Sequence, residues 1–178
     1  MKKTVRVSLT SGNAISTMQN ELDLFMQKIK RQCEEFVNEL AKRGVEIATV
    51  KFGEAIYAGT NDVTVDIQVQ DKLSTAVVAT GEATLFIEFG TGILYPDDHP
   101  EKVDGVVPRG THGKGQGSRP DGWRYYGETG NEPGTRIVRS NAKGNLVHTY
   151  GNPANASLYQ TREELRRDWE SIARRVFK

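Results

Sequence analysis

The first third of the chain carries apolar residues at intervals of three and four, the spacing of one face of an α-helix. This pattern predicts a long amphipathic helix from Ile15 to Arg43, ended by Gly44, which tolerates the backbone conformation after a helix. The next stretch, "VEIATVKFGEAIYAG", suits a second short helix better than a strand, with Gly53 as its weak point. The apolar set of the long helix is Ile15, Met18, Leu22, Phe25, Met26, Ile29, Cys33, Phe36, Val37 and Leu40.

A strict alternation follows in "NDVTVDIQVQD", where four apolar residues from Val63 to Val69 fall on one face. This is typical of a half-buried strand. We expect "STAVVATG" to pair with it through a turn at Asp71 and Lys72, and Gly81 to end the hairpin. "EATLFIEF" then predicts a short helix, with Leu85, Phe86 and Phe89 pointing to one side.

The segment from residue 93 to 153 is punctuated by proline and glycine. With the Gly90–Gly92 turn before it, it holds all six prolines and most of the 18 glycines of the chain. Such composition excludes long regular elements and predicts a long flexible loop or arm. Two islands inside it, "GWRYYG" and "GNLVHTYG", suit short strands.

The closing stretch, "ASLYQTREELRRDWESIARRVF", predicts a second amphipathic helix. Its apolar stripe includes Leu158, Leu165 and Trp169, and Thr161 followed by Glu164 has the spacing of a capping box at a helix start. The chain is therefore expected to be an α+β protein of one domain, residues 1–178. Long N-terminal and C-terminal amphipathic helices would pack on a small antiparallel sheet.

Composition narrows the function classes. The net charge of +1 gives no general basis for nucleic-acid binding, and the single cysteine, Cys33, excludes an internal disulfide framework. Cys33 lies on the apolar stripe and is interpreted as buried packing. No run approaches the ~20 apolar residues of a membrane span, and no signal peptide is recognisable. We expect a protein of a reducing cytoplasm, with no membrane association.

Sites for catalysis or cofactors are hard to find in this sequence. The glycine-rich "GTHGKGQGS" lacks the lysine and hydroxyl order of a phosphate-binding loop, and "GTGILY" lacks the third glycine of a dinucleotide fingerprint. The densest group of metal-ligand types is Asp97, Asp98 and His99, with His112 further on, and we interpret it as an extended loop with solvated acids. His148 is expected on a strand face. We therefore predict neither enzyme activity nor a cofactor.

One carboxylate stands out because it lies between two phenylalanines, in "FIEFGTG". A carboxylate directly before Gly-Thr-Gly can accept hydrogen bonds from the backbone amides of that turn. Gly90 and Gly92 can supply a sharp reversal. We expect Glu88 to stabilise this pivot, from which the long arm leaves the core.

The order of these motifs resembles a known family. The run "ATGEATLFIEFGTG", the loop, a Gly-Trp-x-Tyr segment, "TYGNPANASLY" and a closing helix are similar to tail-completion proteins. These are the head–tail joining, minor tail or neck proteins of long-tailed double-stranded-DNA phages. The resemblance covers Ile15 to Phe177. The family's signature falls on Phe86, Glu88, Phe89, Gly90, Thr91 and Gly92 of this sequence.

The resemblance implies a structural virion protein assembled in the host cytoplasm. It would form a ring, expected to be a hexamer, at the head-proximal end of the tail. Its neighbours would be the tail terminator or tail tube protein and the head-closure or connector protein. DNA would pass through the lumen without sequence-specific contact. Aromatic residues dominate interface energetics, so Trp123, Tyr125 and Tyr150 are the expected anchors of a subunit contact.

Two other functions stay open at this point. The C-terminal arginines, Arg166, Arg167, Arg174 and Arg175, could bind nucleic acid, although interleaved acids favour a solvated helix face. The Asp97, Asp98 and His99 group could serve a metal-dependent hydrolase.

Overall fold

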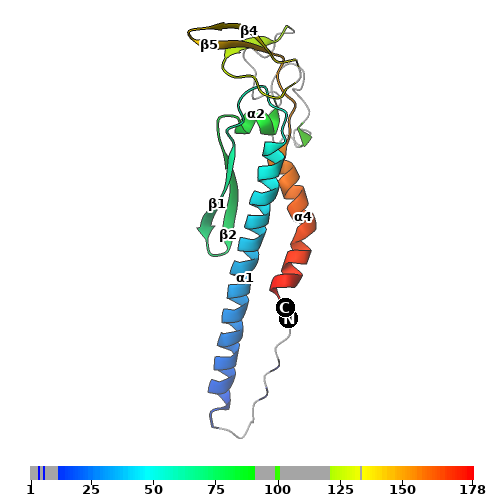
Figure 1. Cartoon of the computed structure of the whole chain (residues 1–178). Coiled ribbons are helices and arrows are strands. Elements are labelled where there is room, and N and C mark those ends of the chain that lie inside the picture. Colours follow the sequence, from blue (N-terminus) through cyan, green and yellow to red (C-terminus); the bar gives the residue numbers. More distant parts are fainter. Residues whose placement is uncertain (1–3, 5, 7–11, 91–98, 101–120, 133) are drawn as a thin grey trace.

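A computed structural model shows how these segments are arranged (Figure 1). It describes residues 4, 6, 12–90, 99–100, 121–132 and 134–178. The described elements confirm an α+β protein with a long N-terminal helix, a C-terminal helix and small antiparallel sheets. Among these residues, no helix combines the length and apolar character needed to cross a bilayer.

The longest element is helix α1, Ala14–Gly53, which is unbroken. The prediction that Gly44 ends the helix and that a second helix follows is therefore wrong. Gly44 is buried inside α1, and a Cβ there would lie 2.8 Å from Val77 and 3.3 Å from Leu165. Its lack of a side chain lets the helix approach its neighbours closely, which outweighs the cost of a helical glycine. Gly53 is the last residue of α1.

Strands β1, Thr64–Asp71, and β2, Ser74–Thr80, form the expected antiparallel hairpin along one side of α1 (Figure 1). The turn lies at Lys72 and Leu73, one residue later than predicted. The apolar face is only partly covered: Val63 and Val65 are half-buried, but Val69 near the turn is 66% exposed. The hairpin therefore packs at its base and extends into solvent at its tip.

Helix α4, Ser157–Val176, runs back along the second half of α1 (Figure 1). Ile172 and Val176 are buried, and the ring of Phe177 packs on that of Phe36 in a tilted arrangement, with centroids 5.7 Å apart. The expected capping box is wrong, because Thr161 lies inside the helix and its hydroxyl donates to the carbonyl of Ser157. Helix α4 begins four residues earlier.

Strands β3, Trp123–Tyr126, and β5, Gly144–Thr149, coincide with the two predicted islands and pair with each other. A third strand, β4, Arg136–Asn141, completes a sheet in the order β3-β5-β4. Sequence analysis missed β4. The second half of the expected arm thus forms a small sheet at the end of α1 rather than one flexible loop. Residues 91–98, 101–120 and 133 lie outside the described part of the chain.

Helix α2, Thr84–Phe89, sits where these parts meet. Its buried core residue is Ile87, which packs in one cluster with Phe52 of α1. Of the three residues predicted to point to one side, Phe86 and Phe89 are half-buried and Leu85 is 50% exposed. Asp62 holds the start of α2: its carboxylate accepts the amides of Glu82 and Ala83 at 2.8 and 2.9 Å. These amides lower the pKa of Asp62, the Ala83 bond most.

Candidate functional site

Glu88, the carboxylate between the two phenylalanines, is buried at the end of α2. Its two oxygens accept the backbone amides of Leu158 and Tyr159, at 2.8 and 3.2 Å. Those amides belong to the first turn of α4, where a helix has unsatisfied donors and a positive dipole end. Glu88 therefore caps α4 from 70 residues away.

This partner differs from the one expected from the sequence. Glu88 was predicted to bond the amides of the Gly-Thr-Gly turn that follows it. Within the described residues its carboxylate turns instead to α4. Thr91 and Gly92, the rest of the predicted signature, lie outside the described residues.

The backbone of α2 is tied to the same segment. The carbonyls of Ile87 and Glu88 accept the amides of Asn155 and Ala156, at 2.8 and 3.1 Å. Asn152 donates its side-chain amide to the carbonyl of Phe86 at 3.0 Å. The end of α2 and the start of α4 thus form one hydrogen-bonded unit.

Asn155 extends the unit to α1. Its side-chain amide donates to the carbonyl of Lys51, near the end of α1, at 2.8 Å, and contacts Ser157 at 2.7 Å. The next residue, Ala156, has φ 51° and ψ 44°, a left-handed conformation unusual for alanine. We call this arrangement the Glu88 node; its residues are Phe86, Glu88, Gly90, Asn152, Asn155 and the first turn of α4.

Gly90 follows α2 directly and has a positive φ of 70°. A Cβ at this position would lie 2.7 Å from the amide nitrogen of Ala154 and 3.1 Å from the carbonyl oxygen of Asn152. Both atoms are backbone and cannot turn aside. The position therefore requires glycine for conformation and for space.

His99 is buried against the node. Its Nε2 lies 3.3 Å from Glu88, and its ring packs 4.9 Å from Phe89 and 6.0 Å from Tyr159 between centroids. The sequence predicted an extended loop with solvated acids at this position, and the structure shows that His99 itself is buried. The other members of that candidate group, Asp97, Asp98 and His112, lie outside the described residues. Among the described residues no group of three or more metal-ligand side chains gathers.

Two predicted aromatic anchors lie beside the node. Trp123 and Tyr125 line a cleft of about 280 Å³ together with Phe86 and Asn152. The Tyr125 hydroxyl donates to the carbonyl of Ala58. Burial raises the pKa of Tyr125.

Tyr150, the third predicted anchor, is not among the residues that line this cleft. Its ring meets that of His148 edge to face, with centroids 4.9 Å apart. His148 is buried on β5 with Nε2 2.7 Å from the carbonyl oxygen of Asp121, so a strand position is confirmed for it.

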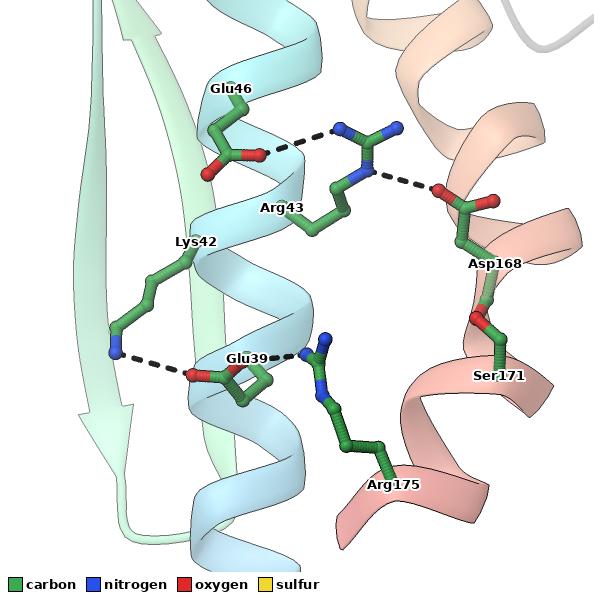
Figure 2. Close-up of polar contacts among 7 residues, drawn as sticks. All are labelled: Glu39, Lys42, Arg43, Glu46, Asp168, Ser171 and Arg175. Atoms are coloured by element: carbon green, nitrogen blue, oxygen red, sulfur yellow. Dashed lines mark hydrogen bonds and ion pairs between the residues drawn. The ribbon is translucent and has the colours of Figure 1, made fainter.

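Three of the four C-terminal arginines, Arg166, Arg174 and Arg175, face carboxylates. Figure 2 shows Arg175 bonded to Glu39 across the α1–α4 seam at 2.7 Å, and Arg43 bonded to Asp168 at 3.0 Å. Arg174 pairs with Glu170 at 2.6 Å on α4 itself. The hydrogen bonds of Arg43 to Asp168 and Glu46 raise the pKa of Arg43, the Asp168 bond most.

Arg166 follows the same pattern, with Glu163 at 3.3 Å. Such pairing offsets positive charge that a phosphate backbone would otherwise attract. This arrangement is that of a solvated, ion-paired helix face rather than a basic patch.

Comparison of the chain with protein-family models, curated proteins and solved structures finds no match.

Proposed function

We propose that this chain is a structural subunit of the neck of a long-tailed phage, a tail-completion protein without enzymatic activity. It assembles as a ring at the head-proximal end of the tail and helps join tail to head. The observation that carries the proposal is the Glu88 node.

The node unites the two motifs on which the family resemblance rests. "FIEFG" contributes Phe86, Glu88 and Gly90, and "GNPANASLY" contributes Asn152, Asn155 and the capped first turn of α4. These segments lie some sixty residues apart in sequence yet bond to each other residue by residue. A motif pair that forms one unit supports a shared fold better than two separate short matches do.

The chemistry of the node suits a structural role. A carboxylate that accepts two backbone amides at a helix N-terminus stabilises that helix through charge-assisted hydrogen bonds. Glu88 is used in this way, with both oxygens engaged. The node therefore acts as a rigid joint between α2, α4 and the end of α1.

Beside the joint, the cleft lined by Phe86, Trp123 and Tyr125 offers aromatic surface. Trp and Tyr supply large contact areas at low entropic cost, so a cleft of this kind suits a side chain from a neighbouring subunit. In the proposed ring, this cleft is the contact that one copy offers to the next.

The experiment is electron microscopy of lysates from a phage or prophage that carries an early stop codon in this gene. We expect DNA-filled heads separate from tails, or tails of abnormal finish, and a plasmid copy of the gene should restore intact particles. Intact infectious particles without the plasmid would contradict the proposal.

The plasmid assay also tests the joint and the cleft. Gly90→Val should fail to restore particles, because the new side chain meets backbone atoms of Asn152 and Ala154. Trp123→Ala should fold but fail, whereas Tyr126→Ala should succeed. Tyr126 is the matched control because it is an exposed aromatic on the opposite face of β3. If both aromatic variants restore particles equally well, the cleft is not part of the ring contact.

A further inference from the structure

The first half of α1 extends beyond the rest of the described fold (Figure 1). Helix α4 covers α1 only as far as Gln32, whose side-chain amide donates to the carbonyl of Val176, the last residue of α4, at 2.7 Å. The hairpin likewise lies against the second half of α1. From Ala14 to Arg31, about 27 Å of helix, most residues are exposed and none is fully buried.

This projecting half carries a continuous apolar stripe. Ile15 is 69% exposed, Leu22 46% and Met26 51%, with Met18 exposed and Phe25 and Ile29 half-buried beside them. Exposed apolar surface of this extent on a soluble chain marks an interaction site. We call Ile15, Met18, Leu22, Phe25, Met26 and Ile29 the α1 stripe.

The spacing of the stripe is symmetric. From Ile15 through Ile29 to Cys33 and Phe36, the intervals are three, four, three, one, three, four and three, the same in both directions. The midpoint lies between Phe25 and Met26. A second copy of the helix, reversed about this midpoint, presents apolar residues at the same levels: Leu22 meets Ile29, and Phe25 meets Met26.

The charges beside the stripe have the matching symmetry. Residues seven apart lie on the same side of a helix, so Asp23 shares one flank with Lys30, and Glu21 shares the other with Lys28. In the reversed pair, Asp23 of one copy and Lys30 of the second copy lie on facing flanks. Their positions along the helix axis differ by about 3 Å. Glu21 and Lys28 are related in the same way. A parallel pair would instead set each charge against its like.

From this arrangement we infer that the α1 stripe is a docking surface for a second copy of the same chain, in an antiparallel helix pair. Such a contact is isologous and closes with two copies. It is separate from the ring contact of the proposed function, which joins each copy to two different neighbours. The pair extends to Phe36, so the start of the second helix would lie beside the end of α4, where Phe177 packs on Phe36.

The first test reverses the charge at four helix positions beside the α1 stripe; Asp23, Lys28 and Lys30 are exposed and Glu21 is partly buried. One variant carries Glu21→Lys and Asp23→Lys, and the other carries Lys28→Glu and Lys30→Glu. Each variant alone places like charges on both flanks of the pair. A mixture restores all four opposite-charge contacts between the two different chains.

Sedimentation equilibrium measures the outcome. We expect the wild-type chain to reach twice its 19.8 kDa mass at micromolar concentrations. Each variant should self-associate on the order of tenfold more weakly, and their mixture should regain wild-type association. A wild-type chain that stays monomeric, with the stripe covered by its own N-terminal residues or left bare, would overturn the inference. So would a mixture that associates no better than either variant.

The second test fixes direction and register through the single native cysteine. In the antiparallel pair Met18 lies level with Cys33 of the second copy. A short bis-maleimide should therefore link the Met18→Cys variant into dimers, but neither the wild type nor the variant that also carries Cys33→Ser. Wild-type dimers linked through Cys33 alone would indicate a parallel pair and overturn the inference.

Discussion

The two halves of helix α1 have the same apolar periodicity but different surroundings. From Gln32 to Phe52 the inner face of α1 is covered by α4 and the β1–β2 hairpin, and Ala48 and Phe52 are almost fully buried. From Ala14 to Arg31 the same kind of stripe is largely exposed. Periodicity thus predicts a helix and its contact face, but not whether the partner of that face belongs to the same chain.

The largest difference in stability is expected between two isoleucine-to-alanine substitutions, one in each half of α1. Ile47→Ala should lower the free energy of unfolding by about 3 kcal/mol, because Ile47 is 5% exposed and its removal leaves a cavity. Ile15→Ala should change it by less than about 0.5 kcal/mol, since Ile15 is mostly solvated. Urea unfolding at low protein concentration measures both. Similar losses would mean that the first half of α1 is packed within the chain.

The next largest loss of stability is expected at Glu88, which joins α2 to α4 beside the packed half of α1. Glu88→Ala leaves the amides of Leu158 and Tyr159 without their acceptor, and we expect a loss of about 2 kcal/mol. Glu88→Gln keeps the shape and one acceptor oxygen, but it removes the charge and turns an NH2 group toward the second amide, so a loss of at least about 1 kcal/mol is expected. The midpoints of urea unfolding measure these losses and should fall from wild type to Glu88→Gln to Glu88→Ala. If Glu88→Ala unfolds at the wild-type midpoint, the carboxylate does not hold α4.

Two glycines of α1 test how closely that half is packed. Gly44→Ala introduces a Cβ 2.8 Å from Val77, so we expect a net loss of about 1 kcal/mol despite the better helix propensity of alanine. Gly53→Ala meets no atom within 4 Å and should be neutral or slightly stabilising. Thermal unfolding of the two variants under one buffer compares them. A stabilised Gly44→Ala would show that the contact is loose enough to accept a methyl group.

Much of this fold could be read from local pattern. Alternation from Val63 to Val69 identified β1, and the stripe of Leu158, Leu165 and Trp169 identified α4. Prediction failed where a distant residue overrides a local signal. Gly44 resembles a helix stop but allows a close approach to Val77. Thr161 resembles a cap, although Glu88 caps the helix at the amides of Leu158 and Tyr159.

The candidate site was found only in part, for the same reason. The sequence singled out Glu88, Gly90 and Trp123, but the partners of Glu88 lie 70 residues away and nothing in its neighbourhood marks them. Strand β4 was missed because its side chains are exposed and show no alternation of apolar and polar residues. Asn155 lies within the motif "GNPANASLY", but a polar loop residue carries no periodic signal that would reveal its contact with Lys51.

The smallest effect is expected at the charged seam between α1 and α4 (Figure 2). Arg43 and Asp168 are bonded at 3.0 Å, but both side chains are more than a third exposed. A double-mutant cycle with Arg43→Ala and Asp168→Ala should give a coupling of about 0.5 kcal/mol. In 1 M salt, where the screening length is about 3 Å, the coupling should fall further. A larger, salt-independent coupling would mean that the seam is shielded from solvent.

The contrast between the halves of α1 is tested most directly by amide hydrogen exchange at several protein concentrations. Residues 40–52 should be strongly protected at every concentration, because α4 and the hairpin cover them. Residues 15–31 should exchange faster in dilute solution and become protected as concentration rises. In the variant that carries Glu21→Lys and Asp23→Lys, the protection of residues 15–31 should not increase with concentration. Equal protection of both halves in dilute solution, unchanged in the variant, would contradict the claim that the α1 stripe is covered only when a second copy binds.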